Sequence, residues 1–167
     1  MSVTPTIENA TSDTIRVLLV EDDDGDALLL RRLLSGWQYA SFHIRRAHSL
    51  SAAILELAQG AIDLVLLDLG LPESRGLDTL ARIRAASARA PIIVLSGLHD
   101  EALAVTAIRQ GAQDYIVKGQ VDGASLVQAI RFAIERHRVQ QALAERVAEL
   151  EQAVAQLQDQ DRQLRSS

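Results

Sequence analysis

Residues 64–68 read LVLLD, four consecutive apolar side chains followed by a carboxylate. A short continuous apolar run of this kind is typical of a strand buried on both faces of a parallel sheet. Two other segments repeat the pattern: the β-rich run IRVLLV at 15–20 precedes Glu21, and PIIVL at 91–95 precedes Ser96. Each run therefore predicts a buried strand with a polar side chain at its carboxyl end.

Helical segments separate these strands. Apolar residues at helical spacing mark four segments, 27–34, 50–58, 77–86 and 101–109. Weaker strand signals lie at 42–47 and 115–117. Five strands alternating with helices predict an α/β fold, a doubly wound five-stranded parallel sheet with the flavodoxin-like strand order 2-1-3-4-5.

Composition restricts the class of protein. The chain has 167 residues, a net charge of −5, 3% aromatic residues and no cysteine. Disulfides and thiolate metal sites are excluded, and an acidic, aromatic-poor chain argues against nucleic-acid binding. Neither a signal peptide nor an apolar stretch approaching 18 residues is present, so we expect a cytoplasmic protein without membrane contact.

Three regions are expected along the chain. The polar residues 1–14 predict a disordered tail, residues 15–138 the α/β domain, and residues 139–167 a coiled-coil helix continuous with the last helix of that domain.

Polar side chains should converge at the carboxyl edge of the sheet, where such folds bind ligands. They are Glu21, Asp22, Asp68, Ser96 and Lys118. Neighbouring carboxylates repel, a hard divalent cation relieves the repulsion, and oxygen-only ligands favour Mg²⁺. A lysine and a hydroxyl supply a cation and a donor for a phosphoryl group. The set predicts phosphoryl transfer to an aspartate.

Four segments together resemble the receiver domain of two-component response regulators. They are VLLVEDD (17–23), LVLLDLGLPESRG (64–76), IIVLSG (92–97) and GAQDYIVKG (111–119). The resemblance covers roughly residues 15–138. It implies a signalling domain, not an enzyme beyond self-catalysed phosphoryl acceptance and loss. It also implies a sensor histidine kinase or a phosphotransfer protein as the partner that donates the phosphoryl group.

The resemblance also assigns roles to the metal site. It implies that Asp68 is the phosphoacceptor and that Mg²⁺ is the cofactor. The implied metal ligands are Asp22 and Asp68 directly, Gly70 through its backbone carbonyl, and Glu21 through water. Asp23 lies one place too late for the acid pair and is interpreted as a loop or cap residue.

The phosphate-binding and switch residues implied by the resemblance are Ser96, Lys118 and Tyr115, with Tyr115 moving inward on phosphorylation. One position departs from the family, which usually has Lys-Pro with a cis peptide bond where this chain has Lys118-Gly119. A cis bond before glycine costs about 3 kcal/mol. We therefore expect a trans bond and a more mobile loop.

A long C-terminal helix is predicted from about residue 125 onward, because the rest of the chain has no proline or glycine. Its heptad seam consists of Leu143, Val147, Leu150, Val154, Leu157 and Leu164. Valine at a with leucine at d favours a parallel two-stranded coil, and hence a homodimer. In the family such a helix often joins the receiver to an effector domain, and none is expected within these residues.

Other functions fit the sequence less well. A constitutive coiled-coil dimerisation module with a non-switching receiver remains the alternative, disfavoured because every site residue is present. An aspartate-nucleophile phosphohydrolase would need a second aspartate where Gly70 stands. A transcription factor would need a helix-turn-helix segment, for which the coil leaves no room.

Overall fold

The computed structural model describes residues 14–38, 40–87 and 89–166. The elements, in chain order, are β1 (Thr14–Val20), α1 (Asp24–Leu33), β2 (Ser41–Ala47), α2 (Leu50–Ala58), β3 (Leu64–Asp68), α3 (Leu77–Ala86), β4 (Ile92–Ser96), α4 (Glu101–Arg109), β5 (Asp114–Val117) and α5 (Gly123–Arg165). The predicted tail, 1–14, lies outside the described residues except for Thr14, which begins β1.

The five strands form one parallel sheet in the order β2-β1-β3-β4-β5. This is the predicted doubly wound, flavodoxin-like order. Pairing places Val20 beside Leu67 and Asp68 beside Leu95. Because all five strands run in the same direction, the residues that follow them meet at one edge of the sheet.

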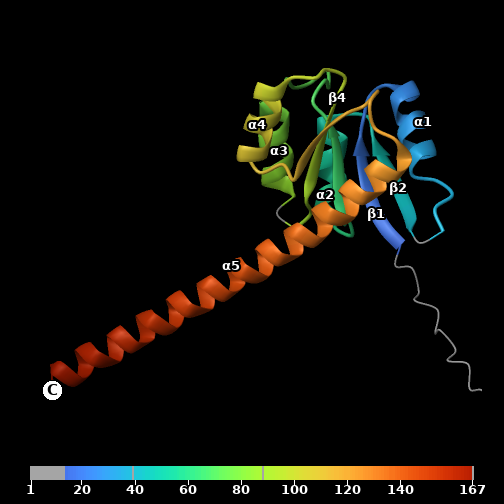
Figure 1. The fold of residues 1–167 in the computed structure, drawn as a ribbon. Coiled ribbons are helices and arrows are strands. Elements are labelled where there is room, and N and C mark those ends of the chain that lie inside the picture. Colours follow the sequence, from blue (N-terminus) through green and yellow to red (C-terminus); the bar gives the residue numbers. More distant parts are fainter. Residues whose placement is uncertain (1–13, 39, 88, 167) are drawn as a thin grey trace, which may run out of the picture.

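The sheet buries apolar side chains on both faces, as continuous apolar strands require. One face packs Leu18, Val65 and Val94 against α2, α3 and α4. The other packs Leu19 and Leu66 against α1 and the first turns of α5. Figure 1 shows these two helical layers on either side of the sheet. Each fully buried leucine contributes about 1.5–3 kcal/mol, which fixes the strand ends in place.

Capping residues set the helix starts, and two helices begin earlier than their apolar spacing predicts. The Asp23 side chain accepts a hydrogen bond from the Asp26 N–H at 2.8 Å, so α1 begins at Asp24 and not at residue 27. The Asp122 side chain accepts from the Ser125 N–H at 2.7 Å, so α5 begins at Gly123. Polar caps extend a helix beyond its buried face.

Helix α5 has two parts. Leu126, Ile130 and Ala133 are buried against the sheet, whereas every residue from 138 to 166 is exposed. The exposed part projects from the domain as one straight continuous helix (Figure 1). Among the described residues, no helix combines the length and the apolar character that crossing a lipid bilayer requires.

A polar clasp fixes α5 where it leaves the domain. The side-chain amide of Gln113 donates to the Gln140 Oε1 at 2.7 Å, and Arg136 donates to the Gln113 carbonyl at 3.0 Å. Gln113 directly precedes β5, so the helix is tied to a strand of the sheet. Gln140 lies seven residues before Val147 and hence at an a position of the predicted heptad, but it contacts the receiver.

Candidate functional site

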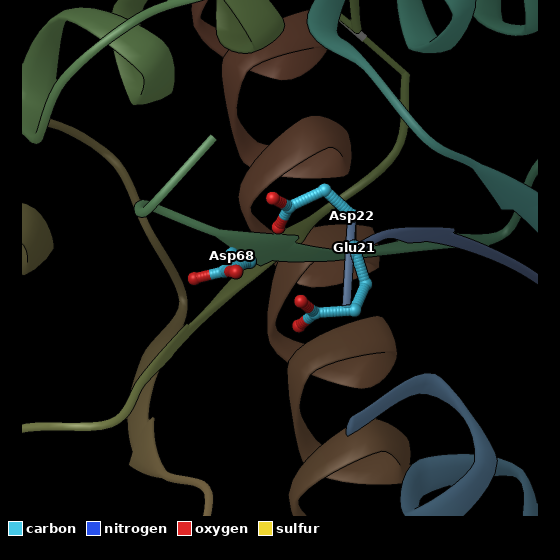
Figure 2. Close-up of side chains that lie close together, drawn as sticks. All are labelled: Glu21, Asp22 and Asp68. Carbon is cyan, nitrogen blue, oxygen red and sulfur yellow. The ribbon is translucent and has the colours of Figure 1, made fainter. Parts of the chain in front are cut away.

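Three carboxylates gather where β1 and β3 end. Glu21 and Asp22 follow β1, and Asp68 is the last residue of β3. A ligand oxygen from each lies within 4.8 Å of the other two. Figure 2 shows the three carboxylates reaching into the same space from two neighbouring strands. The parallel register of β1 and β3 produces this convergence, as the sequence predicted.

Glu21 is completely buried. Its Oε1 accepts a hydrogen bond from the Asp23 N–H at 3.1 Å, and its Oε2 accepts one from the Lys118 Nζ at 2.7 Å. Burial, with a smaller contribution from the neighbouring Asp68, raises the pKa of Glu21 to about 7 in spite of the lysine. Near neutral pH, Glu21 therefore holds a proton more readily than an ordinary glutamate does.

Lys118 follows β5 and reaches across the edge of the sheet to three acids. Its Nζ lies 2.7 Å from Glu21, 2.9 Å from Asp26 and 3.2 Å from Asp68. Burial alone would lower the pKa of Lys118, but hydrogen bonds to Glu21 and Asp26 raise it above its usual value. The lysine therefore stays protonated and offsets much of the negative charge of the site.

Asp26 was not among the predicted site residues. It lies in the first turn of α1, where acids are favoured at any helix start, so its position alone carries no functional signal. The available sequence signal was the acidic run EDDDGD (21–26) directly after β1, which begins with the predicted site residues Glu21 and Asp22 and ends with Asp26. Only the structure places its carboxylate against Lys118.

Asp68 is 7% exposed, so its carboxylate is nearly enclosed. Its Oδ1 accepts a hydrogen bond from the Gly70 N–H at 3.0 Å, and its Oδ2 pairs with Lys118. Asp22, in contrast, faces solvent. An all-oxygen set of three carboxylates, one of them open to water, fits Mg²⁺, which keeps several water ligands. The role of the Gly70 carbonyl as a further ligand remains a prediction.

Ser96 lies at the same edge, and Tyr115, the second residue of the neighbouring β5, reaches the loop beside it through its hydroxyl. Ser96 ends β4, one position beyond Leu95, which pairs with Asp68, and its Oγ accepts from the Leu98 N–H at 3.2 Å. The Tyr115 hydroxyl donates to the Leu98 carbonyl at 2.9 Å. Both side chains thus contact the loop after β4, and the inward movement of Tyr115 remains a prediction.

The loop after Lys118 contains the departure from the family pattern. No cis peptide bond occurs among the described residues, so the predicted trans bond between Lys118 and Gly119 is confirmed. A side chain at Gly119 would meet nothing within 4 Å. The loop is therefore open on the side where the family usually carries proline.

The sequence profile of the response regulator receiver domain family matches residues 17–131, more than half of the chain. The chain belongs to this family. As a receiver, it is a signalling domain of two-component systems, a class in which histidine kinases or phosphotransfer proteins are the usual partners and an acidic pocket binds Mg²⁺. The match begins within β1 and ends in α5, so it includes the predicted metal, phosphoacceptor and switch residues but not the predicted coiled-coil seam.

Two relatives from Escherichia coli (strain K12) resemble this receiver. It is 33% identical over 108 residues to the transcriptional regulatory protein ZraR, covering 65% of this chain and 24% of ZraR. It is 36% identical over 121 residues to the KDP operon transcriptional regulatory protein KdpE, covering 72% of this chain and 52% of KdpE. The chain thus spans a quarter to a half of these relatives.

A solved structure extends the comparison. A response regulator from Burkholderia pseudomallei is 26% identical, with a TM-score of 0.60, and the match covers 78% of this chain and 74% of that one. That crystal structure has a phosphorylated aspartic acid, a calcium ion and citrate.

Proposed function

We propose that this receiver accepts a phosphoryl group on Asp68 from a histidine kinase or a phosphotransfer protein, with Mg²⁺ bound. The observation that carries the proposal is the position of Asp68, which pairs with Lys118 at 3.2 Å beside two further carboxylates within 4.8 Å. The phosphorylated aspartic acid and calcium ion of the Burkholderia pseudomallei relative support this chemistry.

The transfer is a displacement at phosphorus. An oxygen of Asp68 attacks, the P–N bond to the donor imidazole breaks, and the electron pair of that bond stays on the imidazole. Glu21, Asp22 and Asp68 would hold Mg²⁺, which when bound neutralises charge on the phosphoryl oxygens. Lys118 and Ser96 then contact those oxygens. Hydrolysis returns Asp68 to its unphosphorylated form. Water attacks phosphorus, the P–O bond to Asp68 breaks, and inorganic phosphate leaves.

The structural response would pass along β4 and β5. Ser96 and Lys118 are joined through the backbone, where the Lys118 N–H donates to the Ser96 carbonyl at 2.9 Å. If Ser96 turns toward the phosphoryl group, the Leu98 N–H loses its partner and the loop holding Tyr115 is released. Tyr115 moves inward, and the face formed by β5 and α5 changes.

We further propose that α5 joins two receivers in a parallel coiled coil that transmits this change. The six seam side chains are between 45% and 77% exposed. An apolar stripe at heptad spacing is buried when a second helix packs on it. Arg146 at a g position could pair across the dimer with Glu151 at the following e position of the other helix, whereas in the single chain it pairs with Glu149 at 3.3 Å. The alternative, a constitutive dimer with a silent receiver, does not explain the intact set of site residues.

Binding of beryllofluoride, a mimic of the phosphoryl group, tests the proposal without a cognate kinase. Calorimetry and amide spectra would be recorded with Mg²⁺ for the wild type and for Asp68→Asn. We expect Mg²⁺-dependent, saturable binding that shifts the amides of Asp68, Ser96 and Lys118 and is lost in the variant. Equal binding by both proteins, or none by a folded wild type, would overturn the proposal. Sedimentation unchanged by the mimic, with amides of α5 also unchanged, would favour the constitutive dimer.

A further inference from the structure

The ammonium group of Lys118 contacts three carboxylates, although its predicted role in phosphate binding involves only that of Asp68. It donates hydrogen bonds to Glu21 and to Asp26, and it pairs with Asp68. An ammonium has three N–H donors, so the resting site commits two of them to carboxylates other than that of Asp68. The third donor faces Asp68, so a phosphoryl group that accepts from Lys118 through two of its oxygens must take a second donor from Glu21 or Asp26.

The two hydrogen-bonded partners differ in how readily they can release the lysine. Glu21 has a side-chain exposure of 0%, so losing Lys118 would leave a carboxylate buried without its counter-charge. The Asp26 side chain is 42% exposed, so water can replace the lysine there at small cost. Asp26 is therefore the partner from which Lys118 departs.

We propose that Asp26 is a positioning residue that holds Lys118 in the resting site and competes with the phosphoryl group for it. This inference rests on the proposed phosphorylation of Asp68 and adds a competitor to it. Because Asp26 lies in the first turn of α1 and Lys118 directly follows β5, the same exchange breaks this ion pair between α1 and the end of β5 when the site is occupied. The acid sets how tightly the site retains a phosphoryl group.

A general charge effect must be separated from this competition. Asp24 is the matched control, because it lies in the same turn but pairs with Arg46 at 2.7 Å and not with Lys118. Asp24→Asn and Asp26→Asn remove the same charge from neighbouring positions. Asp26→Glu restores a carboxylate that can reach Lys118.

The experiment measures the dissociation constant of beryllofluoride at fixed, saturating Mg²⁺. We expect Asp26→Asn to bind about two- to fivefold tighter than the wild type, the ratio supplied by one partly exposed ion pair. Asp24→Asn and Asp26→Glu should remain close to the wild type. In a Lys118→Gln background, Asp26→Asn should have no further effect, which a merely structural role for Asp26 would not produce.

Several outcomes would overturn the inference. They are unchanged or weaker binding in Asp26→Asn, equal tightening in Asp24→Asn, and an undiminished Asp26 effect when Lys118 is replaced. Failure of the wild type to bind the mimic at all would instead refute the phosphorylation of Asp68. Circular dichroism verifies that each variant folds. The substitutions at Asp24 and Asp26 should leave the fold intact, because both side chains are exposed to solvent.

Discussion

Glu21 has no exposed surface, and its carboxylate accepts hydrogen bonds from Asp23 and Lys118. Burial raises its pKa from 4.5 to about 7, whereas the unfolded chain keeps the ordinary value. The folded protein therefore holds this proton more tightly than the unfolded protein. Between these two pKa values, folding takes up a proton, and the free energy of unfolding falls as pH rises.

Stability in Mg²⁺-free buffer should show this dependence directly. At about 1.4 kcal/mol per pKa unit, the Glu21 contribution lost between pH 4.5 and 7 is about 3 kcal/mol. Glu21→Gln should remove that slope and be the more stable protein above pH 7. Urea unfolding of both proteins from pH 5 to 8 measures the difference. Parallel pH profiles for the two proteins would show that Glu21 ionises normally.

The convergence of the site residues that follow strands was predictable, because parallel strands bring their carboxyl ends together. Asp22, Asp68 and Lys118 each follow a recognisable strand, and the structure gathers them. Asp26 could not be predicted in the same way, since it lies on a helix. Which helical acid faces the site depends on the rotation of α1 about its axis, and that rotation is set by Asp23 and by packing against α5.

At the scale of elements, α1 and α5 approach closely where α5 begins. A side chain on Gly123 would lie 2.9 Å from the Leu33 carbonyl and 2.8 Å from the Trp37 ring. The Trp37 Nε1 also donates to that carbonyl at 2.8 Å. Glycine is therefore required here by contact with another backbone and not by an unusual φ angle.

Gly123→Ala should therefore destabilise the domain by about 1–3 kcal/mol, the cost of overpacking, although alanine is the better helix former. Gly119→Ala is the matched control, because its side chain would meet nothing within 4 Å. Its effect should stay within about 0.5 kcal/mol. Urea denaturation measures both. A Gly123 variant as stable as the wild type would show that α5 shifts freely against α1.

Element boundaries were less predictable than element order. Helices 50–58, 77–86 and 101–109 were predicted with the bounds that the structure has. Helices α1 and α5 began earlier, because their first turns consist mostly of polar or small residues and carry no apolar periodicity. Aspartate caps, and not buried faces, determine those ends.

At the scale of the whole molecule, the proposed association of two receivers depends on the exposed part of α5. Leu150→Asp places a charge in the middle of the seam and should convert the dimer to a monomer at micromolar concentration. Gln152→Asp adds the same charge on the outer face of the helix and should leave the dimer intact. Sedimentation velocity over a range of concentrations distinguishes the two. A wild-type monomer, or equal effects of both substitutions, would refute the seam.

The sequence predicted the heptad but not how it joins the receiver. The clasp between Gln113, Arg136 and Gln140 depends on a loop before β5 meeting a helix some 25 residues later. No local pattern specifies that meeting. It follows from the packing of α5 across the sheet, which only the assembled core determines.

Covalent phosphorylation of Asp68 is the most direct test of this receiver as a switch. The measurement is the intact mass of the full chain after incubation with a small-molecule phosphodonor and Mg²⁺, for the wild type and for Asp68→Asn. The wild type should gain the mass of one phosphoryl group, which EDTA prevents and the variant lacks. A folded wild type that gains nothing, or a variant that gains the same mass, would contradict the role of Asp68.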